Sequence, residues 1–135
     1  MGFLDIFGKK EESKPAGIPF KLETRFRPIR LKALGESKTE LLIDLQNMGG
    51  EDVLVSLVVK LPDKIGFDTI GLYRAKEIRI GQMGNGEGKN LNIEIFGSSK
   101  TTAGNYEVEI TAFSHYRDYG HVLNSVKKKV TLRVV

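Results

Sequence analysis

The sequence predicts an all-β fold, an antiparallel sandwich of two sheets with seven to eight short strands. Apolar and polar residues alternate along much of the chain, most clearly at Val53, Val55, Leu57, Val59 and Leu61. The same period of two returns in residues 106–112 and 130–134. A period of two is typical of strands with one buried face, which is the pattern of antiparallel sheets. Turn residues recur between these runs at the short spacing of a sandwich.

The strands are expected from Phe20 onward, at 20–26, 28–33, 39–47, 52–61, 76–80, 89–96, 105–115 and 122–134. Three stretches between the strands carry residues typical of hairpin turns, namely 47–50, 84–88 and 101–105. For residues 84–88, a loop that crosses between the two sheets is the alternative. The irregular residues 62–75 are predicted to cross between the two sheets. Residues 8–19 have the charged, Pro/Gly-punctuated composition of a linker. The chain therefore divides into an arm and linker, 1–19, and a sandwich, 20–135.

Length and composition exclude several classes of protein. A chain of 135 residues is one domain, and no stretch approaches the ~18 apolar residues of a transmembrane helix. The first ten residues place lysines after the apolar residues, which is the reverse of a secretory signal, so a cytoplasmic location is expected. The absence of cysteine excludes disulfides, thiolate catalysis and cysteine-ligated metals. No Cys, no Trp and many Lys, Glu and Ile residues are typical of a thermophile.

Several short motifs fall at matching places among the strands. An Asn-x-Gly turn stands at Asn47, a strand ends in Leu61-Pro62, Gly-Glu-Gly precedes a later strand, and Ala103-Gly104-Asn105-Tyr106 opens another. Over residues 38–113 this order resembles the immunoglobulin-like domains of the alpha-galactosidase-associated NEW3 type, which are common in archaeal proteins. The resemblance implies an immunoglobulin-like β-sandwich and a role in binding or scaffolding rather than catalysis.

The glycine-rich stretch 84–88 does not form a nucleotide site on this pattern. It lacks the Lys-Ser/Thr pair of a phosphate-binding loop, and no helix follows to offer its N-terminus to an anion. We expect a polar turn there and no cofactor.

The densest cluster of functional groups is predicted to form the tip of the last hairpin. It consists of His115, Tyr116, Arg117, Asp118, Tyr119 and His121. The histidines and the carboxylate could ligate a metal, and the tyrosines with the arginine could stack on a ligand. In the structural alternative, the aromatic rings pack over the end of the sandwich around a turn at Asp118. No nucleophile, base and orienting group are evident in the sequence, so a non-enzyme is expected.

The N-terminal arm is a second candidate for partner binding. Its apolar residues are Phe3, Leu4, Ile6 and Phe7, and they are followed by Lys9 and Lys10. On a helix, the two phenylalanines would stack at i and i+4. So short a segment cannot hold a helix in water, so it is expected to dock on its own domain, on a partner or on an anionic lipid surface.

Basic charge is concentrated on the first and last strands. The candidate residues of this basic stripe are Lys21, Arg25, Arg27, Lys127, Lys129 and Arg133. In immunoglobulin-like sandwiches these strands commonly lie side by side, which would merge the two rows with only Glu23 to offset them. Such a stripe favours nucleic acid, whose binding falls steeply with salt. The structural alternative is that edge lysines prevent aggregation.

The function expected from these patterns is a non-catalytic interaction or scaffolding module. It would bind a protein partner or an anionic membrane surface, in the cytoplasm or peripherally at the membrane, and no small-molecule substrate or cofactor is expected. The alternative is a nucleic-acid-binding domain that uses the basic first and last strands.

Overall fold

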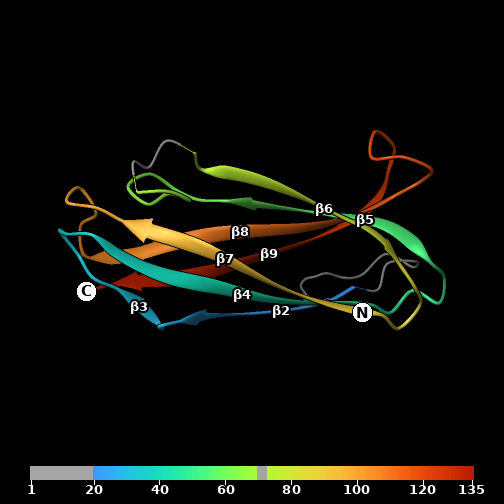
Figure 1. The fold of residues 1–135 in the computed structure, drawn as a ribbon, viewed down its shortest axis with the longest axis horizontal. Helices are drawn as coiled ribbons and strands as arrows, with labels where there is room; N and C mark the ends of the chain where they lie inside the picture. Colours follow the sequence, from blue (N-terminus) through green and yellow to red (C-terminus); the bar gives the residue numbers. More distant parts are fainter. Residues whose placement is uncertain (1–19, 70–72) are drawn as a thin grey trace, which may run out of the picture.

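The computed structural model describes residues 20–69 and 73–135, which form two packed β-sheets (Figure 1). The eight strands in this part of the chain confirm the predicted immunoglobulin-like sandwich. The N-terminal arm lies outside the described residues, so its docking stays a prediction. Among the described residues, no helix is long and apolar enough to cross a bilayer.

The two sheets differ in size. The smaller has the order β2-β4-β7, with bounds Phe20–Arg27, Ser37–Asn47 and Gly88–Gly97. The larger has the order β3-β9-β8-β5-β6, with bounds Arg30–Leu31, Val122–Val134, Gly104–His115, Val53–Lys60 and Ala75–Met83. All neighbours pair antiparallel except β3 and β9, which run parallel.

Alternating side chains of the two sheets meet in one core. Val55, Leu57 and Val59 of β5 are fully buried, as the period of two predicted. They face the inward residues of the smaller sheet, among them Leu41, Ile43, Leu45, Ile93 and Ile95. Each such side chain contributes roughly 1.5–3 kcal/mol by leaving water, and with no disulfides this burial holds the sheets together.

The three stretches predicted as hairpin turns instead connect strands of opposite sheets. Residues 47–50, 84–88 and 101–105 lead from β4 to β5, from β6 to β7 and from β7 to β8. The hairpin prediction is therefore wrong, whereas the sheet-crossing alternative for 84–88 is confirmed. Residues 62–75, predicted to cross, join β5 to its neighbour β6 in one sheet. Turn residues permit a reversal of the chain but do not specify which sheet the next strand joins.

Asn47 explains how the first of these crossings is held. Its side-chain amide is buried and donates to the carbonyls of Glu51, Met83 and Gly84 at 2.7–3.3 Å, while its Oδ1 accepts from the Gly49 N–H at 2.9 Å. One side chain thus ties the β4–β5 turn to the β6–β7 turn. The Asn-x-Gly motif therefore marks a corner between the sheets.

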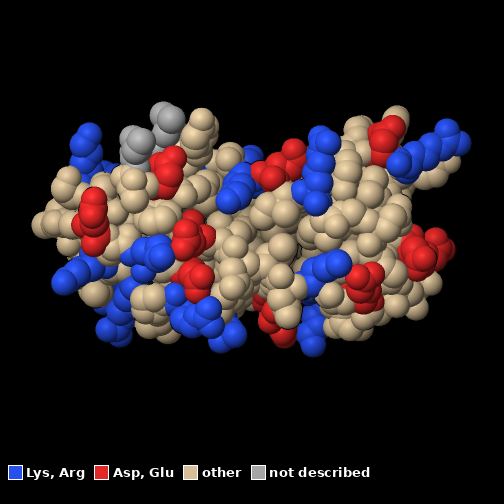
Figure 2. All heavy atoms as spheres, viewed as in Figure 1, with Lys and Arg blue, Asp and Glu red and all other residues tan. Residues whose placement is uncertain are grey.

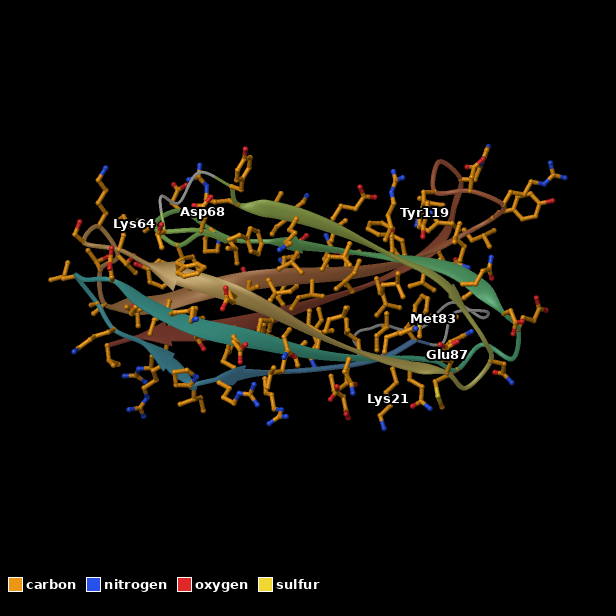
Figure 3. The ribbon with its side chains drawn as sticks, viewed as in Figure 1. Lys21, Lys64, Asp68, Met83, Glu87 and Tyr119 are labelled. Carbon is orange, nitrogen blue, oxygen red and sulfur yellow. The ribbon has the colours of Figure 1, made fainter. Side chains whose placement is uncertain are left out.

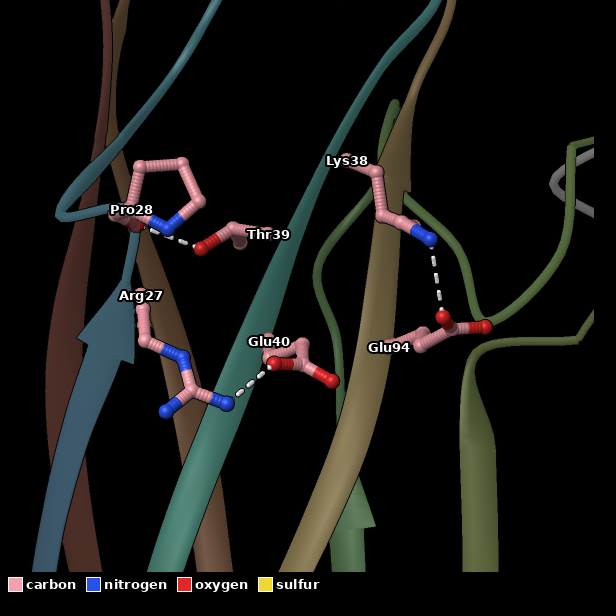
Figure 4. Close-up of polar contacts among 6 residues, drawn as sticks. All are labelled: Arg27, Pro28, Lys38, Thr39, Glu40 and Glu94. Atoms are coloured by element: carbon pink, nitrogen blue, oxygen red, sulfur yellow. Dashed lines mark hydrogen bonds and ion pairs between the residues drawn. The ribbon is translucent and has the colours of Figure 1, made fainter.

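The first strand also changes sheets. After β2 the chain turns at Pro28, whose carbonyl accepts a hydrogen bond from the Thr39 hydroxyl, and β3 then pairs with β9 (Figure 4). The strands β2 and β9 therefore do not lie side by side in one sheet, which corrects the prediction for the basic stripe. They face each other across an open edge, where Lys128 Nζ donates to the Leu22 carbonyl at 3.3 Å.

Candidate functional site

The hairpin tip, residues 115–121, links β8 to β9 and has a fixed backbone. The Tyr116 N–H donates to the His121 carbonyl at 2.8 Å, and the Asp118 N–H donates to the Tyr116 carbonyl at 2.8 Å. Arg117 between them has a φ of 70°, a conformation that few non-glycine residues adopt. A strained residue held by its neighbours is often found at a binding site.

Asp118 closes the turn with its side chain. Its Oδ1 accepts from the Gly120 N–H at 2.9 Å and lies 2.7 Å from His121 Nδ1. The hydrogen bond from His121 and then that from the Gly120 N–H hold the pKa of the Asp118 carboxyl below its usual range. The ionised carboxylate therefore stabilises the turn.

Beneath the tip lies a buried polar pair that the sequence did not reveal. His115 Nε2 is 2.7 Å from Ser56 Oγ, and the two residues are 5% and 1% exposed. On β5 the side chain of Ser56 points to the face opposite that of Val55, and on β8 the side chain of His115 points to the face opposite that of Ala112. Because Val55 and Ala112 face the core, Ser56 and His115 lie on the outer face of the larger sheet. Among the residues that the structure describes, His115 Nδ1 has no hydrogen-bond partner. The only sequence signal for this pair was a single serine in the apolar strand β5.

Tyr119 and Arg79 cover this pair. The ring centroids of Tyr119 and His115 are 5.1 Å apart in an edge-on arrangement, and the Arg79 guanidinium stacks 4.7 Å from the Tyr119 centroid. Figure 3 labels Tyr119 at the base of the tip. The tip thus folds back onto the outer face of the larger sheet.

The other side of the tip faces solvent. Tyr116 is 53% exposed, and the guanidinium of Arg117 stacks 5.2 Å from its ring centroid. Val122 and Leu123, the first residues of β9, are also more than half exposed. A cavity of ≈ 460 Å³ opens beside them, lined by Tyr116, Arg117, Leu123, Phe20, Glu51 and Asp52 among others.

These positions combine the two alternatives predicted for the tip. Tyr119 and His115 are structural, as the packing alternative has it, whereas Tyr116 and Arg117 are exposed and close together, as a binding surface requires. The two histidines face different partners, Ser56 and Asp118. Residues 20–69 and 73–135 contain no group of three or more potential metal ligands.

The six residues of the predicted basic stripe are all exposed but are divided between the two sheets. On the smaller sheet, Arg27 forms an ion pair with Glu40 at 2.7 Å, and the next strand pair adds Lys38 with Glu94 at 2.9 Å (Figure 4). On the larger sheet, Lys127 pairs with Glu109 at 3.5 Å. The register therefore supplies acids beyond Glu23. Figure 2 still shows Lys and Arg gathered at the lower left, where Figure 1 places β2 and β3.

Backbone N–H groups of the glycine-rich stretch 84–88 donate hydrogen bonds within the protein. The Gly84 N–H donates to Glu87 Oε1 at 2.8 Å, the Asn85 N–H to Asp52 Oδ1 at 3.1 Å and the Gly86 N–H to the Asn47 carbonyl at 2.7 Å. The Gly84 amide and then Lys89 lower the pKa of Glu87. These donors are therefore occupied by the turn and by the neighbouring β4–β5 connection, as expected for a polar connection.

No family model and no curated protein matches this sequence. Among solved structures, the chain is similar to part of Escherichia coli alpha-2-macroglobulin, spanning domain MG7 to the C-terminus, with a TM-score of 0.60 and 16% identity. That match covers 89% of this chain and 17% of the macroglobulin chain, so this chain spans less than a fifth of that protein. The CARDB domain of a Pyrococcus furiosus protein, solved in complex with di-metal ions, matches over 90% of this chain and 97% of its own, with a TM-score of 0.51 and 14% identity. At these identities the likeness establishes the immunoglobulin-like sandwich fold.

Proposed function

We propose that this chain is a non-catalytic interaction module that binds a protein partner at the end of the sandwich formed by the hairpin tip. The observation that carries the proposal is the exposed Tyr116–Arg117 pair, held on a hydrogen-bonded loop beside a cavity of ≈ 460 Å³. Tyrosine and arginine are enriched among the residues that dominate protein–protein binding energy. A fixed loop loses little conformational entropy on binding.

The cavity suggests how the partner would be seated. Its lining includes the apolar side chains of Phe20 and Leu123 and the charged side chains of Glu51, Asp52 and Arg117. An apolar side chain of the partner would enter the cavity, with a basic group facing the two acids. Charges of this kind guide the approach and orientation of a partner more than they add affinity.

The non-catalytic part of the proposal rests on the geometry of Ser56 and His115. They form the closest approach to a nucleophile and base in the described residues, but Ser56 is 1% exposed and Tyr119 covers His115. No group in residues 20–69 or 73–135 orients the imidazole through Nδ1. A nucleophilic serine needs both access to substrate and an oriented base, so we assign this pair a structural role.

The nucleic-acid alternative has less support. Three cations on the predicted strands, Lys21, Arg27 and Lys127, are engaged in ion pairs, and base stacking would need aromatic side chains beside the basic residues. A gel-shift titration at low salt tests it directly, because phosphate contacts make such binding strongly salt-dependent.

Site-specific photo-crosslinking tests the protein-binding proposal. A photoreactive amino acid replaces Tyr116 in one protein and Tyr73, which is 63% exposed at a distant position, in a matched control. After irradiation in the native cells, position 116 is expected to yield a discrete cross-linked protein that position 73 does not. Adding Arg117→Glu should reduce that product about tenfold or more, because a buried or stacked arginine at an interface is worth ~2 kcal/mol or more.

Two results would count against the proposal. Equal cross-linking from positions 116 and 73 would show that contact at the tip is non-specific. A product that persists unchanged with Arg117→Glu would place the interface elsewhere.

A further inference from the structure

The end of the sandwich opposite the hairpin tip carries a second set of exposed apolar residues. Ile29, Leu34 and Val135 are 72%, 67% and 52% exposed, and all three are aliphatic. Ile29 stands at the corner between β2 and β3, and Leu34 lies in the turn after β3. Hydrogen bonds bring the C-terminal strand to the same place, since the Ala33 N–H donates to the Val135 carbonyl at 2.7 Å. We call these three side chains the aliphatic end.

Leu34 has an unusual backbone conformation. Its φ is 58°, in the left-handed region that leucine rarely adopts. The conformation is held by the Leu34 N–H donating to the Thr101 carbonyl at 2.8 Å, and Thr101 is fully buried. A large apolar side chain is therefore exposed to solvent on a strained backbone. Strain of this kind is characteristic of functional positions.

Unpaired cations lie among the aliphatic residues. Arg30 of β3 stands directly opposite Arg133 of β9 in the parallel register, and Lys32 follows two residues later. In the described part of the chain none of these three forms an ion pair. Like charges on facing positions of neighbouring strands repel. An external anion would relieve that repulsion. Residues 29–36 contain one acidic residue, Glu36, and it forms no ion pair with these three cations.

From these observations we infer that the aliphatic end docks on an anionic phospholipid surface. Ile29 and Leu34 would enter the boundary between headgroups and acyl chains, while Arg30, Lys32 and Arg133 meet lipid phosphates and carboxylates. Apolar insertion and electrostatic attraction together are what reversible membrane attachment requires. The backbone amides of residues 33 and 34 are already hydrogen-bonded, so insertion leaves no unsatisfied donor there.

Other partners fit this end less well. Aliphatic side chains contribute nothing to a phosphate backbone, and residues 29–36 and 131–135 contain no aromatic ring to stack on a base. Protein interfaces are centred on aromatic residues, and residues 29–36 and 131–135 contribute none. The inference does not depend on the protein-binding proposal, because the two surfaces lie at opposite ends of the strands.

Vesicle co-sedimentation tests the inference. Full-length protein is mixed with vesicles of phosphatidylcholine plus phosphatidylserine, or of phosphatidylcholine alone. The same measurement is repeated in a Phe3→Ser/Phe7→Ser background, which removes the apolar character of the N-terminal arm. Leu34→Asn is the main variant, because asparagine tolerates the left-handed conformation and the fold should be undisturbed. Leu123→Asn at the hairpin tip is the matched control.

The expected result is binding to the anionic vesicles that weakens with salt and is absent on neutral ones. Leu34→Asn should lower the partition coefficient about tenfold in both backgrounds, since burial of a leucine side chain is worth that factor or more. Arg30→Gln/Lys32→Gln should lower it by a similar factor. Leu123→Asn should leave it unchanged, and so should Lys21→Gln/Lys89→Gln, which removes the same charge elsewhere.

Three outcomes would overturn the inference. The first is the absence of binding to anionic vesicles, and the second is equal binding of wild type and Leu34→Asn. The third is retardation of duplex DNA that Arg30→Gln/Lys32→Gln abolishes while vesicle binding is insensitive to Leu34→Asn, which would assign the cations to nucleic acid.

Discussion

The two ends of the sandwich present apolar side chains in different ways. At the hairpin tip, side chains reinforce the backbone bonds of the loop: Asp118 bonds to its own turn, and Tyr119 packs between His115 and Arg79. At the aliphatic end, backbone bonds hold the turn, with Ala33 and Leu34 tied to Val135 and Thr101. The tip exposes a tyrosine and an arginine, whereas the other end exposes aliphatic groups beside unpaired cations.

This difference indicates which changes each end should tolerate. A loop that side chains reinforce depends in part on the identity of those side chains and, where they ionise, on pH. A turn held by backbone bonds can change its exposed residues without losing its shape. The outer side chains of the aliphatic end are therefore free to serve a surface such as a bilayer, and several substitutions there should leave the fold intact.

The largest effect is expected beneath the tip. His115→Ala should destabilise the protein by about 2–4 kcal/mol, because it leaves a cavity and a buried Ser56 hydroxyl without a partner. Urea unfolding followed by circular dichroism measures the change. Ser56→Ala/His115→Leu, which replaces both polar groups by apolar ones, should recover most of the loss. A loss of less than ~1 kcal/mol for His115→Ala would mean that the tip rearranges to fill the space.

A smaller effect of opposite sign is expected at the aliphatic end. Leu34→Asn should stabilise the protein by about 0.5–1 kcal/mol, because asparagine relieves the strain of a positive φ and little buried area is lost. Leu123→Asn, which replaces a comparably exposed leucine in an extended strand, should give no such gain. The midpoints of urea unfolding for the two variants provide the comparison. Equal changes would show that the strain at Leu34 has no energetic consequence.

The smallest effect is a local response of the tip to acid. The folded pKa of Asp118 lies below its ordinary value of 3.8, so its contribution is present at neutral pH and is lost as the pH falls through the folded value. Amide resonances of residues 118–121 should shift in that window in a two-dimensional NMR titration, while those of residues 33 and 34 should not. Asp118→Asn should remove the response. Parallel shifts at both ends would indicate a global transition instead.

The sequence predicted the faces of the strands well because a face is a local property. The alternation at Val55, Leu57 and Val59 correctly marked the buried side of β5. Where the alternation breaks, the prediction shortened the element: β6 was expected to end at residue 80 but continues to Met83. Opposite Val55 and Ser56, the register shifts because β6 contains one extra residue, and Gly81 beside it has a φ of 94°. Beyond this bulge, the positions of β6 that face the core change parity, so the alternation in the sequence breaks.

Pairing partners and the candidate site were harder to predict because they depend on distant parts of the chain. The residues of the turn 47–50 do not indicate that β5 joins the opposite sheet. The sequence around Arg27 likewise does not predict that Glu40 lies opposite it on the neighbouring strand. The tip residues 115–121 were identified from their composition. Their division into buried and exposed members required Ser56 and Arg79, which lie 59 and 36 residues from His115 in the sequence. Likewise, the linear order does not show that Arg30 of β3 lies opposite Arg133 of β9, or that the turn holding Leu34 bonds to Val135.

The passage of the first strand from one sheet to the other also determines how the domain would respond to tension. Phe20 lies at the tip end of β2 and Val134 at the opposite end of β9, so a pull between them acts along both strands (Figure 1). The ladder between β2 and β4 runs across that direction, and its hydrogen bonds would have to slide and break together rather than one after another. Past Pro28 the same segment is held by β9 in the second sheet. Force entering at residue 20 is therefore shared by both layers, a geometry that resists extension far better than the peeling of an edge strand.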